Sequence, residues 1–305
     1  MIKSIIQFVL NLLGNKPKIS KADHNSIKIE EDDIAKDLDL DLEYEEVAEQ
    51  DEEPKILEEE TPEEVVEKIV IKEHFLSDHS YFRGPTKKEW VFLHHTAGWE
   101  NPYRVIDSWD KSPIKIATEF LIGGVNAVTQ ANEHDGEVVR AFPQGAYAWH
   151  LGVGRRKVHT HSVGIELNSF GYLTEGGYYK KVKGEKKWVS LKAECFYTYT
   201  GREVHSDQVI KLDTPFRGYQ YWHAYSPAQL KALKKLLEHI RDVEGIDITK
   251  GLPELIKDKG AHKAFDYVSL TYVQENPGLW LHTNLQKGKF DLYPHPELVK
   301  LLIML

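Results

Sequence analysis

A short apolar segment that ends in two histidines restricts the fold of this chain more than any other stretch. Residues 90 to 93 are the bulky sequence Trp-Val-Phe-Leu, and His94, His95 and the sequence Thr-Ala-Gly follow at once. Such a run suits a strand covered on both faces, as in a sheet between helical layers. Because side chains alternate along a strand, we expect His94 and His95 to point to opposite faces. A lone histidine pair is also typical of hydrogen-bonded loops, so a functional site needs further residues.

Such residues occur near the other end of the chain. Residues 279 to 281, Leu-Trp-Leu, form a second short apolar run that stops at His282, and Asp291 follows after a polar loop. One neutral imidazole from each of two strand ends, together with one carboxylate, makes a set of three ligands with an open fourth position. Catalytic zinc is bound in this way, so the spacing indicates a possible zinc site.

A carboxylate in an apolar segment is the third notable feature. Glu166 lies between Ile165 and Leu167 in the stretch Ser-Val-Gly-Ile-Glu-Leu-Asn, residues 162 to 168. Burial among apolar neighbours raises the pKa of a carboxyl group towards the range useful for proton transfer. The other interpretation is a glutamate on an edge strand that faces water.

These three segments together resemble a known family. The stretch Leu-His-His-Thr-Ala-Gly at residues 93 to 98, the stretch around Glu166, and His282 with Lys289 and Asp291 are similar to the zinc-dependent N-acetylmuramoyl-L-alanine amidases of the type-2 amidase and peptidoglycan-recognition superfamily. The match runs in family order from about residue 76 to the C-terminus. The resemblance implies that Zn²⁺ is held by His94, His282 and Asp291. It also implies that Glu166 is the general base and that Lys289 stabilises the oxyanion.

The resemblance extends to the wall of a substrate cleft. The sequence Ala-Trp-His-Leu-Gly at residues 148 to 152 is similar to the family's cleft wall, which implies substrate contacts from Trp149 and His150. The further residues expected to bind substrate are His95, Thr96 and Asn168. Two other histidines, His159 and His161, are expected to be loop residues, because no third ligand is left for a second metal site.

The implied reaction is hydrolysis of the amide between N-acetylmuramic acid and L-alanine, as in a phage endolysin or a bacterial wall enzyme. Peptidoglycan, rather than nucleic acid, is then the expected partner. Two alternatives stay open. One is a peptidoglycan-binding module of the same fold without activity. The other is a structural component of a phage particle or secretion apparatus that carries the amidase fold.

Charge is distributed unevenly along the chain. Residues 22 to 68 contain 21 acidic and 4 basic residues, a balance of −17, whereas the whole chain carries −9. The rest of the chain therefore carries +8, which suits attraction to an anionic polymer. The acidic stretch is expected to be a largely disordered spacer. Alternatively, it masks the basic part of the chain.

The first 13 residues place apolar side chains at helical spacing, and Gly14 is a plausible stop. This amphipathic helix is too short to span a bilayer and makes no convincing signal peptide. It could dock on a partner protein, lie on a membrane surface, or act as an atypical export signal. We expect a protein made in the cytoplasm that acts on the cell wall.

The rest of the chain alternates between strand and helix signals. Strands are expected at residues 118–123 and 138–142, and helices from residue 101 to Trp109, from a cap at Ser226 to Gly245, and at residues 296–305. Residues 172–222 look like hairpins. The pattern predicts an α/β fold: a single domain at 76–305 with a central mixed β-sheet flanked by helices. A short helix and tail at 1–21 and an acidic linker at 22–75 precede it.

Overall fold

The computed structural model describes residues 68–84, 86–154 and 156–305. The amphipathic helix expected at residues 1–13 and most of the acidic linker lie outside these residues. The strands are β1 (Ile71–Glu73), β2 (Trp90–His95), β3 (Phe120–Ile122), β4 (Val138–Arg140), β5 (Ser162–Leu167), β6 (Tyr172–Glu175), β7 (Gly177–Val182), β8 (Glu185–Ser190), β9 (Phe196–Tyr197), β10 (Glu203–Val204), β11 (Val209–Phe216), β12 (Tyr219–His223) and β13 (Gly278–Leu281). The helices are α2 (Pro102–Asp110), α3 (Lys157–Thr160), α4 (Pro227–Glu244), α5 (Leu252–Lys259), α6 (Ala261–Ala264), α7 (Leu270–Glu275), α8 (His282–Leu285), α9 (Pro296–Ile303) and the 3-10 turn η1 (Ser206–Gln208).

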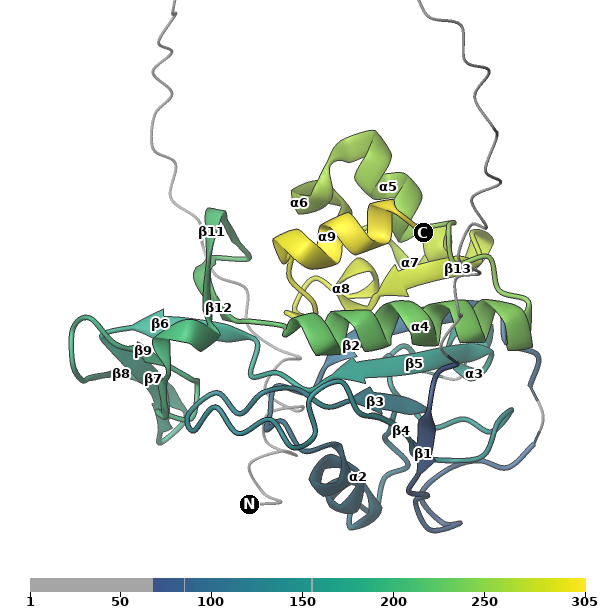
Figure 1. The fold of residues 1–305 in the computed structure, drawn as a ribbon, viewed down its shortest axis with the longest axis horizontal. Coiled ribbons are helices and arrows are strands. Elements are labelled where there is room, and N and C mark those ends of the chain that lie inside the picture. The colour runs from purple at the N-terminus through teal and green to yellow at the C-terminus, as the bar shows by residue number, and fades with distance from the viewer. Residues whose placement is uncertain (1–67, 85, 155) are drawn as a thin grey trace, which may run out of the picture. The chain divides into compact units, whose positions relative to one another are not determined.

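A six-stranded sheet forms the centre of the fold, in the order β1-β4-β3-β5-β2-β13 (Figure 1). Its pairs are parallel except for the antiparallel pair of β3 with β4, so the sheet is mixed. Every residue of β2 is buried, as the apolar run at residues 90 to 93 predicts for a central strand. The predicted mixed α/β fold is confirmed.

Helices cover both faces of this sheet. Along β3, Phe120 and Ile122 belong to the same buried cluster as the apolar stripe of α4, whereas Leu121 belongs to a second cluster with Ile106 of α2. Figure 1 shows α4 running along the sheet near β5 and β2, with α2 lying apart from it. The alternation of side chains along a strand thus divides the core into two layers.

The long helix α4 begins and ends where the sequence signals predict. The side chain of Ser226 accepts a hydrogen bond from the backbone N–H of Gln229, and a proline occupies the first turn. Gly245 ends the helix at a φ of 71°, a left-handed conformation that glycine adopts without steric cost.

The folded region begins earlier than expected. Residues 71–73 form β1, which pairs in parallel with β4, so this part of the predicted 22–75 linker belongs to the sheet. Ile71 is half-buried and packs against the main core cluster, whereas its two neighbours are exposed. A strand of three residues with two charged side chains gives no alternating pattern long enough to detect in the sequence.

Residues 172–222 contain a second sheet of five strands, in the order β10-β9-β6-β12-β11, and a separate hairpin of β7 with β8. These strands agree with the hairpins expected there. Among the described residues, no helix has both the length and the apolar character needed to cross a membrane.

Candidate metal centre

Three neighbouring strands bring the predicted site residues to one edge of the sheet. In the register of β2 with β5, His94 lies directly beside Glu166, so both side chains project from the same face. On the other side of β2, Leu281 lies beside Leu93, and His282 follows as the first residue of α8. Because the strands run in parallel, their carboxyl ends place these side chains together.

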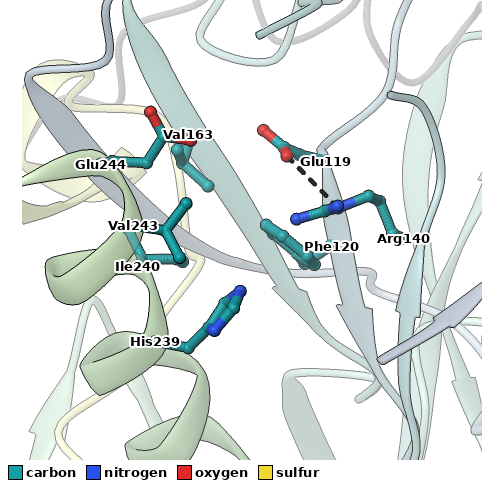
Figure 2. Close-up of a pocket in the computed structure, with 8 residues that line it drawn as sticks. All are labelled: Glu119, Phe120, Arg140, Val163, His239, Ile240, Val243 and Glu244. Carbon is teal, nitrogen blue, oxygen red and sulfur yellow. Dashed lines mark ion pairs between the residues drawn. The ribbon is translucent and has the colours of Figure 1, made fainter. Parts of the chain in front are cut away.

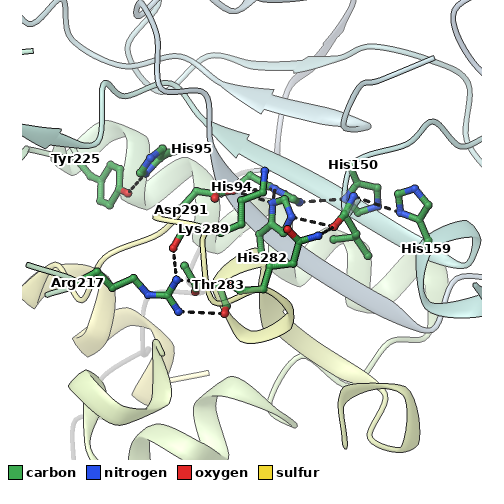
Figure 3. A network of polar contacts seen from close by, with 12 residues as sticks. His94, His95, His150, His159, Arg217, Tyr225, His282, Thr283, Lys289 and Asp291 are labelled. Carbon is green, nitrogen blue, oxygen red and sulfur yellow. Dashed lines mark hydrogen bonds and ion pairs between the residues drawn. The ribbon is translucent and has the colours of Figure 1, made fainter. Parts of the chain in front are cut away.

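Three potential ligand atoms converge at this edge, as Figure 3 shows. The Nδ1 atoms of His94 and His282 are 3.1 Å apart. Oδ2 of Asp291 lies 3.1 Å from the first of these nitrogens and 3.0 Å from the second. Tetrahedral zinc with bonds of about 2.0–2.1 Å separates its ligand atoms by roughly 3.4 Å. The triangle therefore needs to widen by only roughly 0.3 Å to accept zinc.

The hydrogen bonds of His282 identify which ring nitrogen is free. Burial lowers its pKa, so the imidazole is neutral at pH 7 and carries one proton. Its Nε2 lies 3.0 Å from the carbonyl oxygen of Leu151, which can only accept, so Nε2 holds the proton and donates it. Nδ1 is left with a lone pair that points at Asp291, as a metal ligand requires.

A chain of three side chains determines the tautomer of His94 in the same manner. Burial lowers the pKa of His94 to about 4 and that of His150 well below its usual value, so both rings are neutral. His94 Nε2 lies 3.0 Å from His150 Nδ1, and His150 Nε2 lies 2.8 Å from Oγ of Ser162. The hydroxyl of Ser162 donates to the carbonyl of His159 at 3.3 Å. With each N–H directed along this chain, Nδ1 of His94 also keeps its lone pair.

The third ligand supplies negative charge. Burial raises the pKa of Asp291, and only positive charge and hydrogen-bond donation from its neighbours, His282 above all, hold that pKa well below the usual value. With both imidazoles neutral and their lone pairs turned to Asp291, a bound cation has to supply that positive charge. Two imidazole lone pairs and one carboxylate thus face one another in a buried site, an arrangement that repels itself unless a cation lies among them. This donor set, with two nitrogens and one oxygen, fits zinc.

Glu166 lies beside the three donors. Burial raises its pKa well above the usual value, the charge of Asp291 raises it further, and Lys289 opposes both effects. Its buried Oε2 atom has no hydrogen-bond partner within the part of the chain that the structure describes. Such a carboxylate is held ready to accept a proton from a molecule bound at the site.

The loop that carries Lys289 and Asp291 is braced from the second sheet. Nη1 of Arg217 donates to the carbonyl oxygen of Lys287 at 2.9 Å and also to the carbonyl oxygen of Lys289. Nη2 of Arg217 forms an ion pair with Asp266 at 2.6 Å. This arginine was not among the predicted site residues. Arg217 and Gly218 both have positive φ in the tight turn between β11 and β12, and this local conformation carries no sequence signal of the distant loop that the side chain contacts.

His150 and Trp149 occupy the wall beside the metal donors. Both ring nitrogens of His150 form hydrogen bonds, one with His94 and one with Ser162, so this ring orients the metal ligand His94. Its role as a substrate contact stays a prediction. The ring of Trp149 is half-buried and stacks on His159 at 4.7 Å. The prediction that His159 is a loop residue is wrong, because it lies in α3 and is buried beneath this wall.

The other predicted substrate residues support the loops around the site. His95 points to the opposite face from His94, and the hydroxyl of Tyr225 is 3.5 Å from its Nδ1. Thr96 exchanges hydrogen bonds with the backbone of Ser169. Asn168 is buried, and its amide donates to the carbonyl of Trp99 at 2.8 Å. The contacts of Thr96 and Asn168 hold the chain after β2 against the chain after β5. Contact with substrate stays a prediction for His95, Thr96 and Asn168.

A second, small crevice lies between β3, β4 and α4 and contains none of the predicted site residues (Figure 2). Glu119 and Arg140 face each other across it at 3.6 Å, and His239 and Glu244 of α4 complete its polar lining. Burial raises the pKa of Glu119 to about 7, while the charges of Lys88 and Arg140 oppose that increase. No group of metal donors comparable to the first site occurs there among the described residues.

Among the comparisons with known proteins, only the comparison with solved structures found matches. No family model matches this chain, and no curated protein matches it. Solved structures do match. The complex of the N-acetylmuramyl-L-alanine amidase AmiD from E. coli with its substrate is 18% identical, over 54% of this chain and 48% of that chain, with a TM-score of 0.29.

Two further matches cover more of the chain. The structure of PlyL is 10% identical over 76% of this chain and 91% of that one, with a TM-score of 0.39. The hydrolase AmiA from Staphylococcus aureus, in complex with its ligand, is 11% identical over 78% of this chain and 83% of that one, with a TM-score of 0.38. At these identities and TM-scores the likenesses support no inference about the activity of this chain.

Proposed function

We propose that this chain is a zinc-dependent N-acetylmuramoyl-L-alanine amidase that acts on peptidoglycan. The observation that carries the proposal is the buried triangle of His94 Nδ1, His282 Nδ1 and Asp291 Oδ2, with sides of 3.0 to 3.1 Å. Glu166 lies in register beside it. Both imidazoles are neutral, and their other nitrogens are engaged by hydrogen bonds, so all three ligand atoms are directed to one point.

Zinc bound at this triangle would supply a Lewis acid for the substrate carbonyl and a lowered pKa for the attacking water. Glu166 takes a proton from the water while the water oxygen adds to the carbonyl carbon of the substrate. The ammonium group of Lys289 lies beside the donors and stabilises the negative charge that develops on the carbonyl oxygen. Glu166 then returns the proton to the departing nitrogen of L-alanine as the amide C–N bond breaks.

A binding module without activity is the competing interpretation. Such a module needs a surface that contacts the wall, but it does not require a carboxyl group with an unpaired, buried oxygen beside the metal donors. Burying Glu166 destabilises its charged form, as the direction of its pKa shift shows. Proton transfer accounts for this arrangement, and binding alone does not. The site therefore favours an enzyme.

Zinc content and hydrolysis of a small soluble muramyl-peptide test the proposal together. We expect the purified full chain to hold about one zinc ion, as one three-ligand site requires. His94→Ala removes one ligand, so zinc and hydrolysis should both be lost. His79→Ala is the matched control, because His79 is exposed and outside the site, and it should retain both. Full zinc occupancy in His94→Ala, or full hydrolysis after zinc is removed by a chelator, would refute the assignment.

A further inference from the structure

The hairpin of β7 and β8 is an exposed two-stranded sheet whose surface the proposed mechanism does not use. Its base is held by two backbone hydrogen bonds of Gly176, one to the carbonyl of Cys195 at 2.9 Å and one from the N–H of Leu191 at 2.8 Å. Beyond this base, the side chains of both strands are mostly exposed. Figure 1 places β7 and β8 beside β9 of the second sheet, away from β1 and β4.

Four lysines form two like-charged pairs across this hairpin. In the register of β7 with β8, Lys180 lies opposite Lys187, and Lys181 lies opposite Lys186. Like charges directly opposite one another destabilise a strand pair. Within residues 68–84, 86–154 and 156–305, none of these lysines forms an ion pair, and the same holds for Lys183 in the turn. The hairpin therefore presents concentrated positive charge that folding alone does not explain.

Two aromatic side chains share a face with one of the lysine pairs. Tyr179 lies opposite Trp188, two residues along each strand from Lys181 and Lys186 and on the same face as that pair, whereas Lys180 and Lys187 project from the other face. These two residues are 52% and 43% exposed, so neither belongs to the core. They meet edge to face, with centroids 4.9 Å apart. One small surface thus combines aromatic rings with ammonium groups.

We propose that this hairpin binds an anionic polymer of the cell wall whose repeating unit is a sugar or polyol joined by phosphodiesters. The lysines suit the phosphates, and the aromatic rings suit the apolar faces of sugars. Successive stacked bases need separate ring platforms, whereas these two rings contact each other, which favours such a polymer over single-stranded nucleic acid. The inference rests on the proposed function, because it places the enzyme on a wall that contains such a polymer.

Binding of the full chain to walls with and without the polymer tests this inference. The probes are purified walls that contain a polyol-phosphate polymer, the same walls after hydrofluoric acid has removed it, and a single-stranded DNA of equal phosphate concentration. The hairpin variant carries Lys180→Gln, Lys181→Gln, Lys186→Gln and Lys187→Gln. The control variant loses four exposed lysines that form no ion pair with the described residues and lie outside the hairpin, namely Lys87→Gln, Lys111→Gln, Lys257→Gln and Lys263→Gln.

We expect the hairpin variant to bind polymer-containing walls about tenfold more weakly than the control variant at about 50 mM salt, since exposed ion pairs are individually weak but four are lost. The difference should shrink at high salt and disappear on acid-treated walls. Equal loss in both variants would overturn the proposal, because net charge would then suffice. Binding to the DNA as tight as to the walls would overturn it too.

A small soluble muramyl-peptide separates this inference from the amidase proposal. The lysines of the hairpin lie outside the catalytic group, so the hairpin variant should hydrolyse this substrate at the rate of the unsubstituted protein. Thermal unfolding at the same temperature would show that the variant is folded. If no form of the protein hydrolyses the peptide, the proposed function fails, while the difference in wall binding still decides the role of the hairpin.

Discussion

Replacing His150 should weaken zinc binding even though this residue is not itself a ligand. Its Nδ1 accepts from His94 Nε2 at 3.0 Å, and its Nε2 bonds to Ser162 Oγ at 2.8 Å. His150→Phe keeps a ring of similar shape but removes the acceptor. The N–H of His94 is then buried without a partner, and the other tautomer, which blocks Nδ1 with a proton, becomes competitive.

The size of the effect follows from the cost of that buried donor. An unsatisfied buried polar group costs about 1–3 kcal/mol. Each 1.4 kcal/mol corresponds to about a tenfold change in an equilibrium constant, so the Kd for zinc should rise roughly 5- to 150-fold. Competition with a chromogenic chelator measures this Kd directly and needs no substrate.

His150→Asn is the matched control for the same position. The Oδ1 atom of asparagine can occupy the place of the imidazole Nδ1 and accept from His94, so we expect its Kd for zinc to lie within about threefold of the unsubstituted protein. Comparable apoprotein melting temperatures would exclude general unfolding as the cause. Unchanged zinc affinity in His150→Phe would refute the role assigned to this histidine.

Three further predictions concern other parts of the protein. Glu166→Gln should retain zinc and lose roughly a hundredfold or more in turnover of a soluble muramyl-peptide, and near-normal turnover would exclude it as the base. Arg217→Ala should loosen the loop that carries Lys289, so KM should rise or kcat should fall, while the melting temperature falls by only a few degrees. Unchanged kinetics would show that Arg217 does not position this loop. Because burial raises the pKa of Glu119 from 4.5 to about 7, the folded state binds its proton more tightly than the unfolded state does. The stabilisation from protonated Glu119 is therefore complete below pH 4.5 and is lost as the pH rises through 7. Between pH 5 and 8, the free energy of unfolding of the unsubstituted protein should fall by roughly 1–3 kcal/mol more than that of Glu119→Gln. Denaturant unfolding of both proteins at each pH measures this difference. An equal pH dependence of the two unfolding midpoints would contradict the prediction.

The parts of the fold with strong local patterns are those that the sequence predicts well. The apolar run from Trp90 becomes the central strand, and the cap at Ser226 begins the long helix, because each pattern is decided by a few neighbouring residues. The convergence of His94 with His282 is also anticipated, since each ends or follows a buried strand and parallel strands end at the same edge.

Features that depend on distant contacts cannot be predicted from local sequence patterns. Arg217 acts on a loop more than sixty residues away, and nothing in its neighbourhood reveals that partner. His159 lies in a single helical turn, and its burial depends on stacking against Trp149 rather than on its own neighbours. The role of His150 is hidden in the same way, because hydrogen bonding between its ring and His94 is a property of the assembled sheet and not of either sequence segment.

Mass spectrometry of digested peptidoglycan tests the central claim most directly. Purified sacculi are incubated with the zinc-loaded full chain, with the chelator-treated protein, and with Glu166→Gln. The account predicts free stem peptides that begin at L-alanine, together with intact glycan strands, from the zinc-loaded protein, and little or none from the other two. Cleavage within the glycan or the stem peptide, or equal release without zinc, would contradict it.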